Sequence, residues 1–368
     1  MLTTIDNAVE LLKQGKMIIL VDDEQRENEG DLCMLAEYVT ADDVNFMARY
    51  GRGLICLTMT QSRLAELDIP PMTAHNTSRF HTAFHVSIEA AEGVTTGISA
   101  HDRAHTMKLA ASKGCTSNDL ARPGHVFPIA ARPGGVLVRI GQTEGSVDLS
   151  TICGSDIPAG VICEIMKDDG TMARMPDLEI FSQIHDIPIV TIADLVAWRL
   201  NRECLVQKSS ERMLQDGIAK GFKAISFKNQ IDGTTHLALT WNLENGDKKP
   251  LIRVHSGAVW NDLLGLNDDG HALENALGRI REYGCGALLY IHRDGDELES
   301  ALTGNTKPDV DAVNHIAPNT KLYGTGAQCL RALGISDMIL LTDTPKKLAA
   351  LDGFGLRIAA TEPLHKNI

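Results

Sequence analysis

The segment from Asp22 to Asp31 carries the densest chemistry of the chain, because six of its ten side chains are carboxylates and Arg26 is its only basic residue. Apolar runs at residues 17–21 and 32–36 flank the segment and predict buried strands, so the acidic residues form a loop fixed at both ends. Crowded carboxylates repel one another, and a divalent cation or a basic partner would offset their charge. Oxygen ligands favour Mg²⁺, and Arg26 suits a phosphate or carboxylate group. A solvated polar turn is the alternative interpretation.

Three later segments contain groups suited to proton transfer or phosphate binding. His125 lies in a predicted Pro/Gly-rich loop at residues 122–128, and imidazole titrates near neutral pH, although a lone histidine can also be structural. Arg139 and Thr143 stand where a predicted strand leads into a short helix, whose N-terminus favours phosphate. Glu164 lies in an apolar run, where desolvation would suit a carboxyl to proton transfer, unless it pairs with a buried arginine.

Length and composition describe a globular protein of two domains. The chain has 368 residues and a net charge of −13, which argues against a nucleic-acid surface and an acidic membrane. No apolar run approaches the roughly 20 residues of a membrane helix, and the first residues do not resemble a signal peptide. The eight cysteines form no C-x-x-C pair and favour reduced, buried thiols. We therefore expect a cytoplasmic protein.

The elements that position these groups alternate between strand and helix up to about residue 201. This alternation predicts an α+β fold, an α/β-type sandwich of a mixed sheet and helices. A polar stretch at residues 203–210 predicts a boundary between a domain at 1–203 and a domain at 204–368. The elements expected from the pattern are strands at 53–59, 85–88, 136–139, 161–165, 187–190, 287–291 and 338–341 and helices at 40–49, 191–201, 271–283 and 326–333.

Residues 3 to 202 resemble one family, the 3,4-dihydroxy-2-butanone 4-phosphate synthases of riboflavin biosynthesis. Several long motifs in a fixed order make this resemblance specific. The motifs lie at residues 22–31, 76–78, 88–97, 122–128 and 168–174.

The resemblance implies a magnesium-dependent homodimer that converts ribulose 5-phosphate to formate and a four-carbon phosphate. Mn²⁺ is an alternative metal. The implied catalytic residues are His125 and Glu164. The implied metal ligands are Glu27 and Gln142, and the implied substrate-binding residues are Arg26, Glu27, Asp31, Arg139, Ile140, Gly141, Gln142, Thr143 and Glu164. Enolisation beside a carbonyl needs a base, an acid and a cation, which this set would supply.

Gln142 departs from the family pattern, in which a histidine at this position is the second metal ligand. A glutamine oxygen can coordinate Mg²⁺, but the amide cannot act as a base. We therefore expect Gln142 to be a ligand or a contact of a metal-bound water.

Residues from about 204 resemble the GTP cyclohydrolase II domain that is often fused to this synthase. The resemblance rests on residues 253–256, 321–328, 340–347 and 353–356. The family binds zinc through three cysteines, whereas residues 257–270 contain none, and the Arg-Gln-Glu-Gly-Arg-Gly motif is replaced at 292–297. The resemblance therefore implies a domain that binds no zinc and has lost GTP hydrolysis.

Three other interpretations remain. The chain could be a bifunctional enzyme that still opens GTP, or a sugar-phosphate-binding regulator disabled by Gln142. A Nudix-type pyrophosphatase would also use an Arg-Glu pair such as Arg26–Glu27, but that pair belongs to a helix, whereas the residues upstream of Arg26 are β-like.

Overall fold

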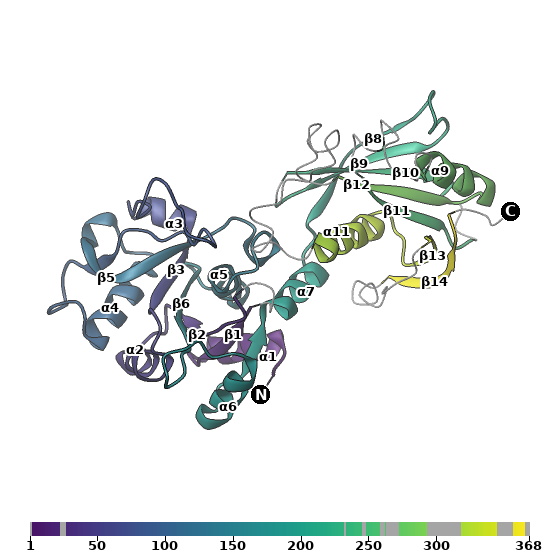
Figure 1. Cartoon of the computed structure of the whole chain (residues 1–368). Helices are drawn as coiled ribbons and strands as arrows, with labels where there is room; N and C mark the ends of the chain where they lie inside the picture. Colours follow the sequence, from purple (N-terminus) through teal and green to yellow (C-terminus); the bar gives the residue numbers. More distant parts are fainter. Residues whose placement is uncertain are drawn as a thin grey trace. The chain divides into compact units, whose positions relative to one another are not determined.

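The chain folds into two compact units, one ending at Trp198 and one beginning at Arg199, in a computed structural model (Figure 1). The structure describes residues 2–22, 27–231, 233–244, 248–257, 262, 272–292, 318–343 and 356–364. Each unit is built on its own mixed sheet with helices, which confirms the predicted fold class. The domain boundary after residue 203 stays a prediction.

The first unit is organised around a mixed sheet with strand order β4-β5-β3-β6-β2-β1-β7. Its strands are β1 (Ile18–Val21), β2 (Gly30–Leu35), β3 (Cys56–Thr60), β4 (Ile88–Ala90), β5 (Leu120–Ala131), β6 (Ala159–Glu164) and β7 (Ile189–Thr191). Its helices are α1 (Ile5–Lys13), α2 (Ala41–Phe46), α3 (Gln61–Glu66), α4 (Ala100–Ala110), α5 (Gln142–Cys153), α6 (Met175–His185) and α7 (Ile192–Arg202). Short helical turns are η1 (Met47–Gly51), η2 (Ser117–Asp119) and η3 (Gly135–Leu137).

Helices cover both faces of this sheet because the strand residues that point to either face are apolar. On one face, Leu32 and Val161 pack in a core with residues of α2, α4 and α6. On the other face, α5 lies directly on the strands, because Gly145 leaves room for Leu20 and for Ile192. The burial of both faces explains why β1 and β2 are continuous apolar runs.

Several elements follow their sequence signals closely. Thr40 and Asp43 form the predicted capping box at the start of α2, although the helix continues as a π-helical turn from Met47. The strand expected at residues 85–88 begins only at Ile88, as β4. Two further predictions are wrong. Residues 136–139 form the 3₁₀ turn η3 and its exit instead of a strand, and residues 122–128 lie within the strand β5 instead of a loop.

The second unit has a mixed sheet with strand order β14-β13-β11-β12-β10-β9-β8. The strands are β8 (Val206–Met213), β9 (Lys223–Asn229), β10 (Thr235–Trp241), β11 (Leu251–Gly257), β12 (Gly286–His292), β13 (Asp337–Leu341) and β14 (Arg357–Glu362). The described helices are α9 (Ala272–Tyr283) and α11 (Pro318–Ala332). These helices and the strands β12 and β13 confirm the elements predicted here.

All eight cysteines are free thiols, and most are buried, as the sequence predicted. Burial raises the pKa of Cys33, Cys56 and Cys163 well above the ordinary value, so these thiols stay protonated and unreactive at neutral pH. Within the described part of the chain, no helix combines the length and the apolar character needed to cross a membrane.

Candidate functional site

Three predicted site residues lie in one row across the end of the first sheet. Asp31 on β2 is the register partner of Glu164 on β6, and the pairing of β6 with β3 and of β3 with β5 brings His125 level with them. The adjacent positions on the three strands belong to the core of the opposite face: Leu32, Cys163 and Val126. Because side chains alternate along a strand, Asp31, Glu164 and His125 therefore point to the face that α5 covers.

The Asp31 carboxyl in this row is buried, and its pKa is raised. It is 4% exposed, and its Oδ1 atom has no hydrogen-bond partner among the described residues. Burial raises the pKa of Asp31 well above its ordinary value, and the charges of Glu164 and Glu27 raise it further. A cation placed beside these carboxylates would reverse that effect, because it favours the ionised form.

Glu164 is held by the backbone that leads into β3. Its Oε2 atom accepts a hydrogen bond from the Leu54 N–H at 2.8 Å, and its carbonyl accepts one from the Gly53 N–H at 3.2 Å. A Cβ atom at Gly53 would lie 2.5 Å from this carboxylate, so only glycine fits there. The alternative in which Glu164 pairs with a buried arginine receives no support from these contacts.

The acidic loop is fixed by contacts that leave its carboxylates close together. The Asp22 carboxylate accepts hydrogen bonds from the Glu27 N–H (3.3 Å) and the Glu29 N–H (2.8 Å). Arg174 donates to the Glu27 carbonyl and to the Asn28 carbonyl (2.6 Å), and the same nitrogen lies 3.5 Å from Glu29 Oε1, so this cation binds both the backbone and one carboxylate of the loop. Burial, followed by the charge of Glu27, raises the pKa of Glu29. Arg26 lies outside the described residues.

The predicted phosphate segment forms the first turn of α5. Ser146 Oγ lies 2.7 Å from Thr58 Oγ1, and Ser150 Oγ accepts from the Ala159 N–H at 3.1 Å. Since Ala159 begins β6 and Glu164 ends it, α5 runs antiparallel to β6 and its N-terminus points toward the row of acids. The helix starts after Gly141, no side chain caps it, and Gln142 and Thr143 are buried at this end, with Ile140 just before it.

The Arg139 side chain contacts the first turn of α5. Its Nη1 atom donates to Glu144 Oε2 at 2.6 Å, Nη2 donates to the Phe80 carbonyl at 3.3 Å, and both charged side chains are buried. A Cβ atom at Gly141 would lie 2.5 Å from the Arg139 guanidinium, so a larger residue there would displace the end of the Arg139 side chain. Since Arg139 and Glu144 neutralise each other, the uncapped N-terminus of α5 is the feature that favours an anionic ligand there.

His125 has a partner that the sequence analysis did not single out. Its Nδ1 atom lies 2.8 Å from Glu89 Oε2, across from β4 to β5. The two residues are 36 positions apart, so nothing in their local spacing could reveal the contact. The contacts of Arg174 with the acidic loop join residues about 146 positions apart and depend likewise on the fold.

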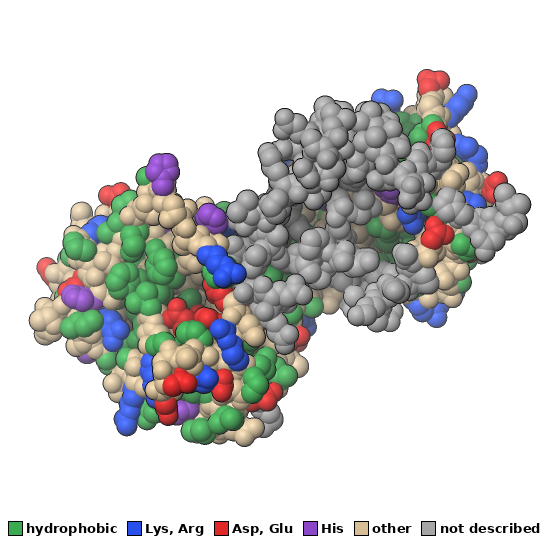
Figure 2. Space-filling model, viewed as in Figure 1, with side chains coloured by type: hydrophobic (Ala, Val, Ile, Leu, Met, Phe, Trp, Pro, Cys, Tyr) green, Lys and Arg blue, Asp and Glu red, His purple; other side chains and the backbone are tan. Residues whose placement is uncertain are grey.

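The donor set fits a hard cation held by few protein ligands. Among the described residues, no three or more His, Cys, Asp or Glu side chains stand close enough to form a metal cage. Glu27, Gln142 and the Oδ1 atom of Asp31 instead offer oxygen donors, and Mg²⁺ characteristically binds one or two carboxylates and keeps several waters. Acidic and basic side chains gather side by side on the face of this unit seen in Figure 2.

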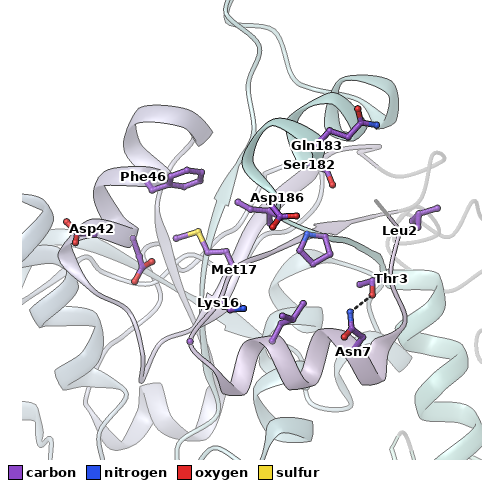
Figure 3. A pocket seen from close by; sticks show the side chains of 15 residues that line it. Leu2, Thr3, Asn7, Lys16, Met17, Asp42, Phe46, Ser182, Gln183 and Asp186 are labelled. Atoms are coloured by element: carbon purple, nitrogen blue, oxygen red, sulfur yellow. Dashed lines mark hydrogen bonds between the residues drawn. The ribbon is translucent and has the colours of Figure 1, made fainter.

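A separate cavity of about 840 Å³ opens between α1, α2 and α6 (Figure 3). Thr3 and Asn7, whose side chains are hydrogen bonded at 2.7 Å, line it together with Asp42, Phe46 and Ser182. None of the predicted catalytic, substrate or metal residues lines this cavity. The row on the sheet and the cavity are therefore different places in the unit.

In the second unit, His255 and Tyr290 are register partners on β11 and β12, and Asp262 bridges them. The Asp262 carboxylate lies 3.0 Å from His255 Nε2 and accepts from the Tyr290 hydroxyl at 2.6 Å. Cys285 and Cys329 are buried, and burial raises the pKa of Cys329 to about 12. Apart from Asp262, the cysteine-free residues from 258 to 270 and the replaced motif from 293 lie outside the described residues.

Comparisons with known proteins agree with both resemblances. The family model of 3,4-dihydroxy-2-butanone 4-phosphate synthase matches residues 6–198, and that of GTP cyclohydrolase II matches residues 207–363. The riboflavin biosynthesis protein RibBA of Aquifex aeolicus is 47% identical over 377 residues, covering 98% of this chain and 92% of that protein. The 3,4-dihydroxy-2-butanone 4-phosphate synthase of Pseudomonas aeruginosa is 43% identical, with coverage of 98% and 99%.

Solved structures extend the likeness to three dimensions. RibBX from A. baumannii, a two-domain 3,4-dihydroxy-2-butanone 4-phosphate synthase, is 36% identical with a TM-score of 0.80, covering 98% of this chain and 99% of that one. A 3,4-dihydroxy-2-butanone 4-phosphate synthase in complex with two magnesium ions is 37% identical with a TM-score of 0.51, covering 53% of this chain and 96% of that one.

Proposed function

Because this chain belongs to the 3,4-dihydroxy-2-butanone 4-phosphate synthase family, we propose that it converts D-ribulose 5-phosphate to L-3,4-dihydroxy-2-butanone 4-phosphate and formate with Mg²⁺. The chain is a synthase of riboflavin biosynthesis with a second domain of the GTP cyclohydrolase II family. The observation that carries the proposal is the row of Asp31, Glu164 and His125 beside the acidic loop and the N-terminus of α5.

The metal would be held by Glu27 and Gln142, and Mn²⁺ is a second metal that such oxygen donors accept. When bound, the cation supplies positive charge that stabilises negative charge developing on the substrate oxygens. The buried, unpartnered Oδ1 atom of Asp31 supports this assignment, since it gives the substrate or a metal-bound water a hydrogen-bonding partner inside the site.

The remaining proposed roles come from the family resemblance, and the positions of the residues support them. His125 and Glu164 would exchange protons with the substrate as it enolises and loses its fourth carbon. Thr143, the N-terminus of α5 and the charge of Arg139 would hold the phosphate, with Ile140 and Gly141 shaping that end. Arg26 and Asp31 would contact the sugar.

We propose that the second domain hydrolyses no GTP and binds no zinc. The support is the sequence, in which the three zinc cysteines of the family are missing and the substrate motif is replaced. A bifunctional enzyme is the second candidate, because the GTP cyclohydrolase II model matches most of this domain. A non-catalytic regulator is the third, since Gln142 replaces a metal-binding histidine of the family.

The assembly and location are proposals from the family resemblance. We propose a homodimer in the cytoplasm that acts on a small phosphorylated sugar and contacts neither nucleic acid nor membrane. The net charge of −13 supports the last point, since it repels polyanions.

Two experiments on the full chain test these proposals. Expression in a bacterial strain that lacks its own 3,4-dihydroxy-2-butanone 4-phosphate synthase should restore growth without riboflavin, and failure by a soluble chain would favour a regulator.

The purified chain should contain no stoichiometric zinc and release no formate from GTP. Zinc at one ion per chain together with GTP turnover would instead establish the bifunctional enzyme.

A further inference from the structure

Glu89 contacts the imidazole of His125 in a way that could control its protonation. The Glu89 Oε2 atom lies 2.8 Å from His125 Nδ1, and the Glu89 side chain is 18% exposed against 44% for His125. An ionised carboxylate only accepts hydrogen bonds, so this contact places the hydrogen of a neutral imidazole on Nδ1. The other ring nitrogen, Nε2, is then the one with a lone pair.

An irregularity in the sheet creates this contact. Ile88 on β4 pairs with Val126 on β5, but the next residue, Glu89, pairs with Ala121. The four residues from Arg122 to His125 therefore have no partner on β4 and bulge out of the ladder. A bulge re-aims the side chains that it contains, and here it brings the His125 ring and the Glu89 carboxylate together.

The backbone at Gly97 packs closely against the Glu89 carboxylate. A Cβ atom at Gly97 would lie 2.1 Å from the carboxylate, and Gly97 has a φ of +84°, so its backbone fits closely against Glu89. Asp102, 2% exposed on α4, fixes this turn by accepting from the Gly97 N–H (3.1 Å) and the Thr95 hydroxyl (2.7 Å). The support behind His125 thus extends from α4 through the 95–97 turn to Glu89.

We propose that Glu89 is a positioning residue that orients His125 and fixes its Nδ1–H tautomer, leaving Nε2 as the nitrogen that exchanges a proton with substrate. This inference rests on the proposed function for its catalytic consequence, but the tautomer itself is a property of the unliganded protein. The chemistry is that of a carboxylate behind a histidine, in which loss of the carboxylate charge leaves the wrong tautomer.

The decisive experiment measures the His125 tautomer by long-range ¹H–¹⁵N spectra of the labelled full chain, at about pH 8, where an ordinary imidazole is neutral. The His125 signal is assigned by its disappearance in His125→Gln. We expect the Nδ1–H form in the wild-type protein. The Nε2–H form would overturn the proposal, and this readout requires neither turnover nor a variant at position 89.

Glu89→Gln tests the consequence for the reaction. It removes the charge at nearly constant volume and should lower kcat by about 100-fold or more, with KM changed by no more than about twofold. The His125 spectrum should lose its pure Nδ1–H signature. The matched control is Glu92→Gln, an exposed carboxylate on the neighbouring turn, which should behave like the wild type.

A folded Glu89→Gln variant with wild-type kcat and an unchanged His125 spectrum would show that Glu89 is merely structural. If the wild-type protein releases no formate at all, the proposed function fails, whereas the tautomer measurement still decides the role of Glu89.

Discussion

At the scale of single residues, the environment of Asp31 in the fold differs from the one that its place in the sequence motif suggests. In the sequence, it is the last acid of a polar loop, whereas in the structure it faces Glu164 across two antiparallel strands and is buried. Burial and the neighbouring charges of Glu164 and Glu27 raise the pKa of Asp31, and a cation placed beside these groups would oppose that shift.

Glu27→Ala should remove a metal ligand from this cluster. We expect kcat/KM to fall by about 100-fold or more, the upper end of the cost of removing a group that supports a metal site. Calorimetric titration with Mg²⁺ should show a matching loss of affinity. The control is Glu10→Ala, which removes an exposed acid on α1. Wild-type turnover in Glu27→Ala would refute the metal assignment.

Gln142→His should keep the enzyme active, because an imidazole nitrogen can take the place of the amide oxygen as a ligand. We expect turnover within about tenfold of the wild type, a difference of about 1.4 kcal/mol in the barrier. The measurement is formate release at saturating Mg²⁺ and, separately, Mn²⁺. Complete loss of activity in a folded variant would mean that Gln142 has a role that imidazole cannot fill.

At the scale of elements, the sequence predicted those parts whose signals are local. The capping box of α2, the apolar strands β1 and β6 and the helix α9 follow from capping chemistry and periodicity. The strand β5 was predicted as a loop around Arg122–His125, since Pro and Gly usually end strands. Pairing with β3 and the bulge against β4 accommodate these residues. The Glu89–His125 contact depends on that pairing and therefore could not be predicted.

Asp102, which fixes the turn at residues 95–97, gives a testable pH dependence of stability at the scale of elements. Hydrogen bonds, chiefly from the Thr95 hydroxyl, lower the pKa of Asp102 to about 2. An aspartate with a lowered folded-state pKa contributes stability above its unfolded value of about 3.9, and this contribution is lost as the pH falls toward the folded value. The stability advantage of the wild type over Asp102→Asn should therefore shrink between about pH 4 and about pH 2.

Thermal unfolding of both proteins across this range is the appropriate measurement. The difference in Tm between them should be largest and constant above about pH 5, well above the unfolded-state pKa. Asp119→Asn, which changes an exposed Thr116–Asp119 capping contact, serves as the comparison for a carboxylate away from the His125 support. A Tm difference for Asp102→Asn that does not depend on pH would contradict the assigned linkage.

At the scale of the whole molecule, a synthase domain is joined to a second domain of the GTP cyclohydrolase II family. The helix α7 leads from the first unit into the second, and Gln328 on α11 donates to the carbonyls of Leu200 and Glu203 (2.9 Å each) at its end. A buried glutamine that satisfies the last carbonyls of a helix stabilises that end. Because α7 begins in the first unit and its last residues belong to the second, removal of the second domain would leave the end of this helix without these hydrogen bonds.

Deletion of the residues after Arg202 should therefore lower the Tm of the synthase and change its assembly or its kinetics. The milder variant Gln328→Leu removes the side-chain hydrogen bonds to the Leu200 and Glu203 carbonyls and from the Leu205 N–H, and it should show part of the loss in Tm. Thermal unfolding, light scattering and steady-state kinetics measure the three effects. If the truncated chain matched the full chain in all of them, the second domain would have no supporting role.

The most direct test of the central claim is formate release from ribulose 5-phosphate labelled with ¹³C at its fourth carbon. The account predicts ¹³C-formate and one equivalent of a four-carbon phosphate in the presence of Mg²⁺, and neither product after treatment with a chelator. Restoring Mg²⁺ should restore both. No formate from a folded, Mg²⁺-supplied chain would contradict the account, as would undiminished release in chelator.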